Sequence, residues 1–142
     1  MPRNQPENHL QNVPMFRFQK NDTLQNLILA AQTVYDAWDQ DSDGIDLELG
    51  TGGICQDIAE AMQDVLIKTG IESRSVDNEG IVEQHVWIVF KHKNKYWELD
   101  IPPHIYETGS GYVWHKKPDV VFHVDHLCIQ PASPDYAEIF RE

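Results

Sequence analysis

The sequence predicts an α+β fold in which N-terminal helices pack on an antiparallel β-sheet. Apolar residues recur at helical spacing in two segments of the first half of the chain. β-Branched and aromatic runs separated by turn residues fill the second half, and helices that precede a strand meander are typical of this class. The 142 residues suffice for one core but not comfortably for two. We therefore expect a polar arm over residues 1–20 and a single domain over residues 21–142.

Two helices are expected before the sheet. The first spans residues 23–38 and presents an apolar stripe to the core, and a polar loop rich in Asp and Gly follows over residues 39–53. The second spans residues 55–69, with Gly70 as its C-terminal cap. The stripe of this second helix places Cys55 on the buried face of its first turn.

After Gly70, the spacing of the apolar residues changes from that of a helix to that of strands. Strands are expected at residues 71–76 and 84–90, and a returning strand at 96–101 ends at a Pro-Pro pair. A loop over residues 104–118 and a last strand over residues 120–129 complete the domain.

The net charge and the cysteine content indicate which binding partners and which cellular compartment the sequence favours. The formal net charge of -12 is unfavourable for binding nucleic acid or an anionic membrane. Two cysteines are few for a small secreted domain, and no signal peptide or membrane-spanning stretch is recognisable. We expect a cytoplasmic protein, although an injected effector is also compatible with the sequence. Nothing in it indicates the oligomeric state.

Cys55 has the setting of a reactive thiol. A thiol attacks as the thiolate, which a helix N-terminus and a nearby imidazolium both favour. Gly52, Gly53 and Ile54 precede Cys55 at the start of the second helix. The two glycines allow the backbone to approach a substrate closely, and backbone N–H groups there could stabilise an oxyanion.

His85 and Asp100 are candidates for the base and for the acceptor that orients it. The turn between their strands decides whether the two side chains meet. An even-length loop, such as Lys93-Asn94, places both on one face of the hairpin as diagonal or opposite neighbours, whereas an odd one separates them. Trp87 and Glu98 are expected near the same region, Glu98 as a cleft residue and Trp87 as a channel wall or as part of the core.

Three segments together resemble a known family. They are Gly53-Ile54-Cys55, His85-Val86-Trp87 and the run from Trp97 to Asp100. In this order they are similar to the transglutaminase-like core of the papain-like cysteine protease superfamily. The resemblance covers about residues 50–103.

This resemblance implies a papain-like fold and a triad of Cys55, His85 and Asp100. It further implies an amide-bond reaction on a peptide or protein through a thioester, as in a peptidase, deamidase or amide transferase, with no cofactor required. The alternative is a catalytically silent binding module of the same fold, which could depend on calcium.

Two further clusters raise the question of a metal. Asp39, Asp41 and Asp43 match the first half of a calcium loop, but Gly50 occupies the position where a bidentate Glu is needed. A solvated acidic loop is the preferred interpretation.

The second cluster contains His123, Asp125, His126 and Cys128. In the expected strand, His126 points away from His123 and Asp125, so a zinc site would need a ligand from elsewhere in the chain.

Overall fold

The fold is described by a computed structural model that covers Phe18 and residues 22–42, 45–46, 53–77, 85–110 and 113–140. Its elements follow in the order α1 (Thr23–Ser42), β1 (Ile45–Asp46), α2 (Ile54–Lys68), β2 (Ser73–Asp77), β3 (Val86–His92), β4 (Lys95–Asp100), the 3₁₀ helix η2 (Pro103–Ile105), β5 (Glu107–Ser110), β6 (Val113–Lys116), η3 (Val124–His126), β7 (Cys128–Pro131) and η4 (Pro134–Phe140). Among the described residues, no helix is long and apolar enough to cross a membrane.

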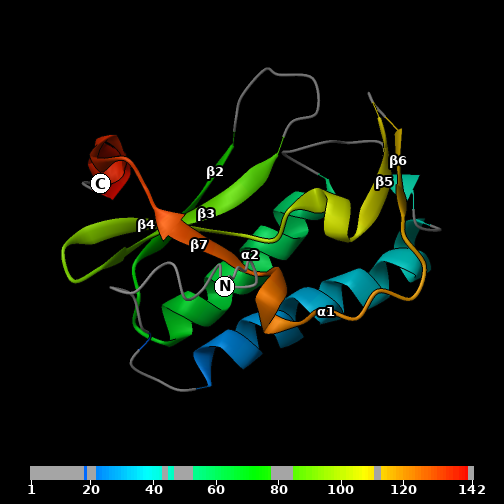
Figure 1. The fold of residues 1–142 in the computed structure, drawn as a ribbon, viewed down its shortest axis with the longest axis horizontal. Coiled ribbons are helices and arrows are strands. Elements are labelled where there is room, and N and C mark those ends of the chain that lie inside the picture. Colours follow the sequence, from blue (N-terminus) through cyan, green and yellow to red (C-terminus); the bar gives the residue numbers. More distant parts are fainter. Residues whose placement is uncertain are drawn as a thin grey trace, which may run out of the picture.

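The main sheet has four strands in the order β2-β3-β4-β7, and every neighbouring pair is antiparallel. A smaller antiparallel sheet has the order β1-β6-β5. Helix α2 packs against β2 and β3, and α1 packs against α2 (Figure 1). The expected α+β class, with helices on an antiparallel sheet, is confirmed.

The hydrophobic core lies between α2, α1 and the four-stranded sheet. Each of these elements contributes side chains that are almost completely buried, because their apolar residues recur with the period of the element. The central ones are Leu27, Ala31, Ile58, Met62, Leu66, Ile88, Phe90, Leu99 and Ile129.

Helix α2 forms almost where the sequence predicts it. Gly53 is its N-cap residue, and Gly70 follows the helix with a φ of 91°. The backbone N–H of Ile71 donates to the carbonyl of Leu66 (2.9 Å), and that of Gly70 donates to Ile67 (2.9 Å). These two bonds form a Schellman motif, which requires the left-handed conformation that glycine adopts at low cost.

Helix α1 extends beyond its predicted end, from residue 38 to Ser42. The first helix-breaking residue after this point in the sequence is Gly44, so the helix continues through residues 39–42. The expected loop over residues 39–53 also contains the short strand β1.

The hairpin of β3 and β4 has a two-residue turn at Lys93-Asn94. Both residues have positive φ, 52° and 64°, as in a type I′ turn. The register pairs Ile88 with Leu99 and His92 with Lys95. The loop therefore has an even length, which is the case in which His85 and Asp100 were expected on one face of the hairpin.

Two predictions for the C-terminal third are wrong. The expected loop over 104–118 contains the hairpin β5–β6, whose two strands have only four residues each and lack a clear alternation. The expected strand over 120–129 is reduced to β7 at its end, and its middle forms η3.

Side chains of α1 explain why residues 120–122 do not join a sheet. The amide of Gln32 donates to the carbonyl of Val120 (3.2 Å), and its oxygen accepts the N–H of Phe122 (2.9 Å). The hydroxyl of Tyr35 accepts the N–H of Val120 (3.0 Å). These contacts satisfy backbone groups that a β-ladder would otherwise use.

Candidate functional site

Cys55 lies in the first turn of α2, and only 5% of its surface is exposed. Gly53 caps the helix through its backbone, because Gln56 and Asp57 donate their N–H groups to its carbonyl (3.1 and 3.3 Å). Ile54 and Cys55 are both buried at this end of the helix. The N-terminal end of α2 therefore presents a thiol where the helix dipole favours negative charge.

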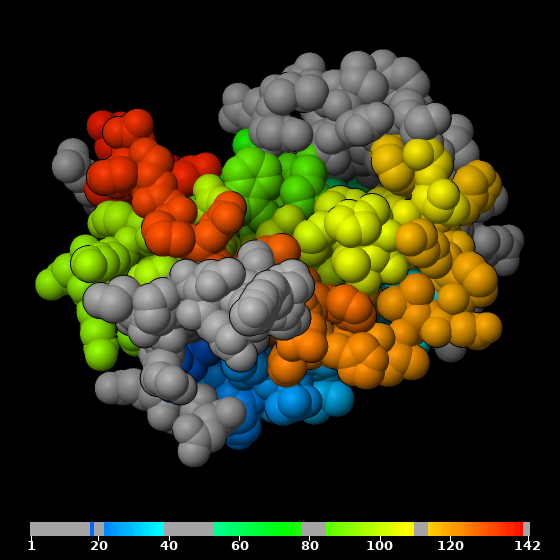
Figure 2. Space-filling model, in the orientation of Figure 1, coloured from blue at the N-terminus to red at the C-terminus, as the bar shows by residue number. Residues whose placement is uncertain are grey.

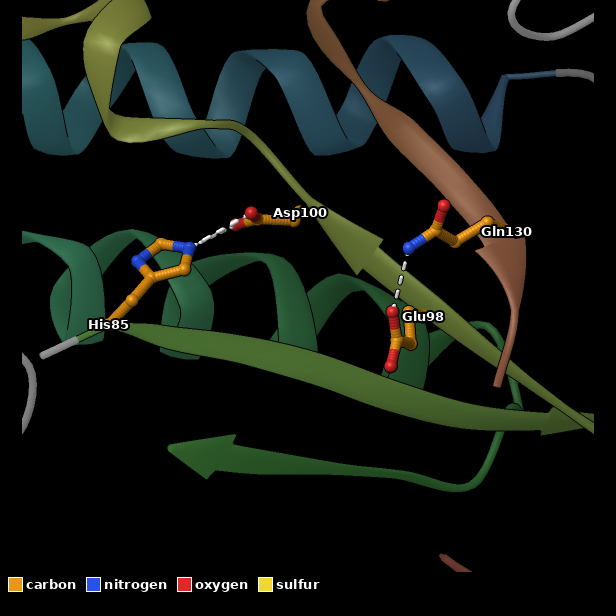
Figure 3. Close-up of polar contacts among 4 residues, drawn as sticks. All are labelled: His85, Glu98, Asp100 and Gln130. Atoms are coloured by element: carbon orange, nitrogen blue, oxygen red, sulfur yellow. Dashed lines mark hydrogen bonds and ion pairs between the residues drawn. The ribbon is translucent and has the colours of Figure 1, made fainter. Parts of the chain in front are cut away.

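His85 directly precedes β3, and Asp100 is the last residue of β4. The Nε2 atom of His85 lies 2.9 and 2.8 Å from the two carboxylate oxygens of Asp100. The side chains are mostly buried, with 18% and 26% of their surface exposed. Figure 3 shows the two side chains pointing toward one another from neighbouring strands. The predicted pairing of the two residues is thus present in the structure.

Cys55 is a second side-chain partner of His85. Nε2 contacts Asp100, and the opposite ring nitrogen, Nδ1, is buried. Burial lowers the pKa of His85, but hydrogen bonds to Asp100 and Cys55, together with the charges of both, outweigh it and raise that pKa to about 9. The imidazole is therefore protonated at neutral pH, and the structure brings together all three residues that the sequence singles out.

Trp87 follows His85 on the same strand, and its indole stacks on the imidazole. The ring centroids are 5.9 Å apart and the planes meet at 26°. The Nε1 atom of Trp87 is buried. Trp87 therefore contacts the site itself, and it is half-buried and lies outside the hydrophobic core.

Glu98 lies two residues before Asp100 on the same face of β4, where its carboxylate accepts a hydrogen bond from the amide of Gln130 (2.9 Å; Figure 3). It borders the site without contacting His85 in Figure 3. Gly52, which was expected beside the thiol, lies outside the described residues.

Cys128 lies next to the site, a position that the sequence did not reveal. It pairs directly with Asp100 across β4 and β7. Burial, followed by the negative charge of Asp100, raises the pKa of the Cys128 thiol. The pairing joins segments 28 residues apart, so no local pattern could have shown it.

The structure places the two clusters considered as metal sites in different elements, one around η3 and the other at the end of α1. His123 and Asp125 do not lie in a strand, because this segment forms η3, in which Nδ1 of His126 accepts the backbone N–H of His123 (3.0 Å). Asp39 and Asp41 belong to the last turn of α1, and Asp43 lies outside the described residues. Within the described ranges, no three His, Cys, Asp or Glu side chains are arranged to hold a metal.

A separate surface depression lies between α1 and the segment after β6. Leu29 and Val121, two large apolar side chains that are mostly exposed, lie on its rim. None of Cys55, His85 and Asp100 lines it. The thiol site and this depression are therefore distinct features of the surface.

Comparisons of the chain with models of known protein families, with curated proteins and with solved structures give no match.

Proposed function

We propose that the chain is a cysteine-dependent amide-bond enzyme with a transglutaminase-like site, in which Cys55 is the nucleophile, His85 the acid and base, and Asp100 the residue that orients His85. The supporting observation is the position of the imidazole, which contacts Asp100 through Nε2 and has Cys55 as its second partner. A thiol, an imidazole and a carboxylate in this order are the arrangement that activates a nucleophile.

The proposed reaction begins when the sulfur of Cys55 attacks the carbonyl carbon of an amide and opens the C=O double bond to an oxyanion. Collapse of this tetrahedral intermediate breaks the C–N bond and leaves a thioester on Cys55. The protonated His85 delivers its proton to the leaving nitrogen, so that an amine departs. Water or a second amine then attacks the thioester and loses its proton to His85, and Cys55 leaves as the thiolate, which restores the pair of thiolate and protonated imidazole.

Two further groups at the site contribute to this reaction. The carboxylate of Asp100 holds the imidazole in one orientation and stabilises its protonated form. The backbone at the start of α2 supplies N–H groups near the position of the oxyanion. The substrate class is a peptide or protein amide, as the family resemblance implies.

Thiol labelling tests this proposal within a single chain, because Cys128 is a built-in reference. The protein would be treated with a small alkylating reagent between pH 5 and pH 9, and each cysteine followed by mass spectrometry of its peptide. We expect Cys55 to be labelled rapidly well below pH 8, while Cys128 reacts slowly because burial and Asp100 favour its protonated form.

The variants His85→Ala and Cys55→Ser complete this experiment. His85→Ala should remove the rapid reaction at Cys55, and the thiolate absorbance near 240 nm should fall by the same amount as in Cys55→Ser. The absorbance does not depend on access of a reagent to the buried thiol. If Cys55 has an ordinary thiol profile in both measurements, the enzyme proposal is wrong and a binding module of the same fold is favoured.

A further inference from the structure

The depression between α1 and the segment that follows β6 has the dimensions of a groove for a short peptide. Its volume is about 900 Å³. Its wall on α1 runs from Gln25 to Asp36, which is about 16 Å along the helix axis. Five extended residues of a polypeptide have about the same length. In Figure 2 the orange atoms of the segment that follows β6 lie beside the blue atoms of α1.

Two large apolar side chains are exposed on the rim of this depression. Leu29 on α1 and Val121 on the opposite wall have 62% and 63% of their surface exposed. Among the described residues, the only other large apolar side chain with comparable exposure is Ile67 (55%), which belongs to α2 and does not line the depression. Apolar side chains gathered beside a concave surface are typical of a site that binds another molecule.

Hydrogen bonds within the protein hold the two walls of the depression together. The side chain of Gln32 bonds both the carbonyl of Val120 and the N–H of Phe122. The hydroxyl of Tyr35 accepts the N–H of Val120. The depression is therefore formed before a partner arrives, and a preformed site loses less conformational entropy on binding.

The charges that line the depression favour a basic partner. The carboxylates of Asp36 and Asp119 both line it, and neither takes part in an ion pair with any residue that the structure describes. The two lysines of the lining are engaged within the protein. The ammonium of Lys116 lies 4.2 Å from the centre of the Tyr35 ring, and that of Lys117 donates to a backbone carbonyl of η2. The carboxylates remain for a cationic partner, which the net charge of -12 also attracts.

We propose that this depression binds a short segment of another protein that carries both aliphatic and basic side chains. The aliphatic side chains pack on Leu29 and Val121, and the basic ones lie beside the carboxylates of Asp36 and Asp119. None of the three residues of the thiol site lines the depression, so the proposal does not depend on the function proposed above.

Three synthetic pentapeptides with acetylated and amidated ends test this surface. The first has the sequence Lys-Leu-Lys-Leu-Lys. In the second serine replaces leucine, and in the third glutamate replaces lysine. In an NMR titration of the full chain, we expect the first peptide to shift the amide signals of Leu29 and Val121, and its affinity to fall at high salt. The second and third should bind about tenfold more weakly or not at all, because they lack the apolar surface and the positive charge, respectively.

Matched variants locate the binding of the first peptide. Leu29→Ser should weaken it about tenfold through the loss of apolar contact, whereas Ile67→Ser, an equivalent change on α2, should have no effect. Asp119→Asn should weaken it about two- to fivefold through the loss of charge. Asn tolerates the left-handed conformation of Asp119 (φ 57°), so this change preserves the wall. Asp64→Asn, on the exposed face of α2, is its control.

Several results would overturn the proposal. It is wrong if none of the peptides binds, if all three bind alike, or if Leu29→Ser and Ile67→Ser have equal effects. It is also wrong if sedimentation shows that the chain self-associates and that Leu29→Ser abolishes this association, because the depression then binds a second copy of the chain.

Discussion

Both carboxylate oxygens of Asp100 lie within 3 Å of the same nitrogen of His85, at 2.9 and 2.8 Å. Both oxygens of the carboxylate thus contact Nε2 of the imidazole, and the opposite ring nitrogen points away from Asp100 (Figure 3). A negative charge so placed favours the protonated imidazole and selects one orientation of the ring. The predictions that follow start from this pair.

Asp100→Asn should weaken the thiol site. The amide keeps the size of the side chain but removes the charge that stabilises the imidazolium, so the labelling rate of Cys55 at pH 6.5 should fall about tenfold or more. Any amide-bond activity should fall further, by roughly 10²–10⁴-fold. Asp64→Asn, which alters an exposed ion pair with Lys68 on α2, is the matched control and should have no effect. Equal rates in the two variants would contradict the role given to Asp100.

The stability of the protein should depend on pH through His85. Its folded-state pKa, about 9, lies above its ordinary value of 6.5. The folded state therefore holds a proton that the unfolded chain loses first, and the stabilisation is complete below pH 6.5 and lost as the pH rises through 9. Asp100→Asn should cost on the order of 2 kcal/mol near pH 6 and much less near pH 9.5.

Urea unfolding at a series of pH values measures this difference. The free energies of unfolding of wild type and Asp100→Asn should converge as the pH rises. A gap that stays constant from pH 6 to pH 9.5 would mean that Asp100 stabilises the fold without acting on the protonation of His85.

Gly70→Ala should destabilise α2 through its C-terminal cap. A Cβ at this position meets nothing within 4 Å, so the cost comes from the φ of 91° alone. We expect a loss of about 1 kcal/mol in the free energy of unfolding, and a smaller loss for Gly70→Asn, since Asn tolerates this conformation better. Thermal unfolding with equal losses for both substitutions would point to a cause other than backbone strain.

Gln32→Ala should release the segment that follows β6. It removes the donor to Val120 and the acceptor for Phe122 at once, so a loss of roughly 1–3 kcal/mol is expected. Amide hydrogen exchange should accelerate at Phe122. Gln130→Ala, which removes only an exposed contact with Glu98, is the control and should cost well under 1 kcal/mol. Unchanged exchange at Phe122 in Gln32→Ala would show that other contacts hold this segment.

The sequence was most informative where local rules decide the structure. The cap at Gly70, the start of α2 and the turn at Lys93-Asn94 each depend on a few neighbouring residues, and from them the meeting of His85 with Asp100 could be predicted. Strands longer than five residues were also placed within about two residues.

The remaining features depend on contacts between distant segments. Hydrogen bonds with the side chains of Gln32 and Tyr35 replace a strand at residues 120–122, and these side chains lie more than 80 residues earlier in the chain. Cys128 reaches the site through β7, whose short length leaves no periodic signal. Pattern analysis of single segments has no access to such pairings.

The chain order of the elements has a consequence during synthesis on the ribosome. The thiol of Cys55 emerges on α2 well before its partners, and β7, which closes the edge of β4 beside Asp100, emerges later still. A nascent chain therefore carries Cys55 before the imidazole of His85 is in place beside it. We expect the proposed reactivity of Cys55 to appear only once the late strands have docked.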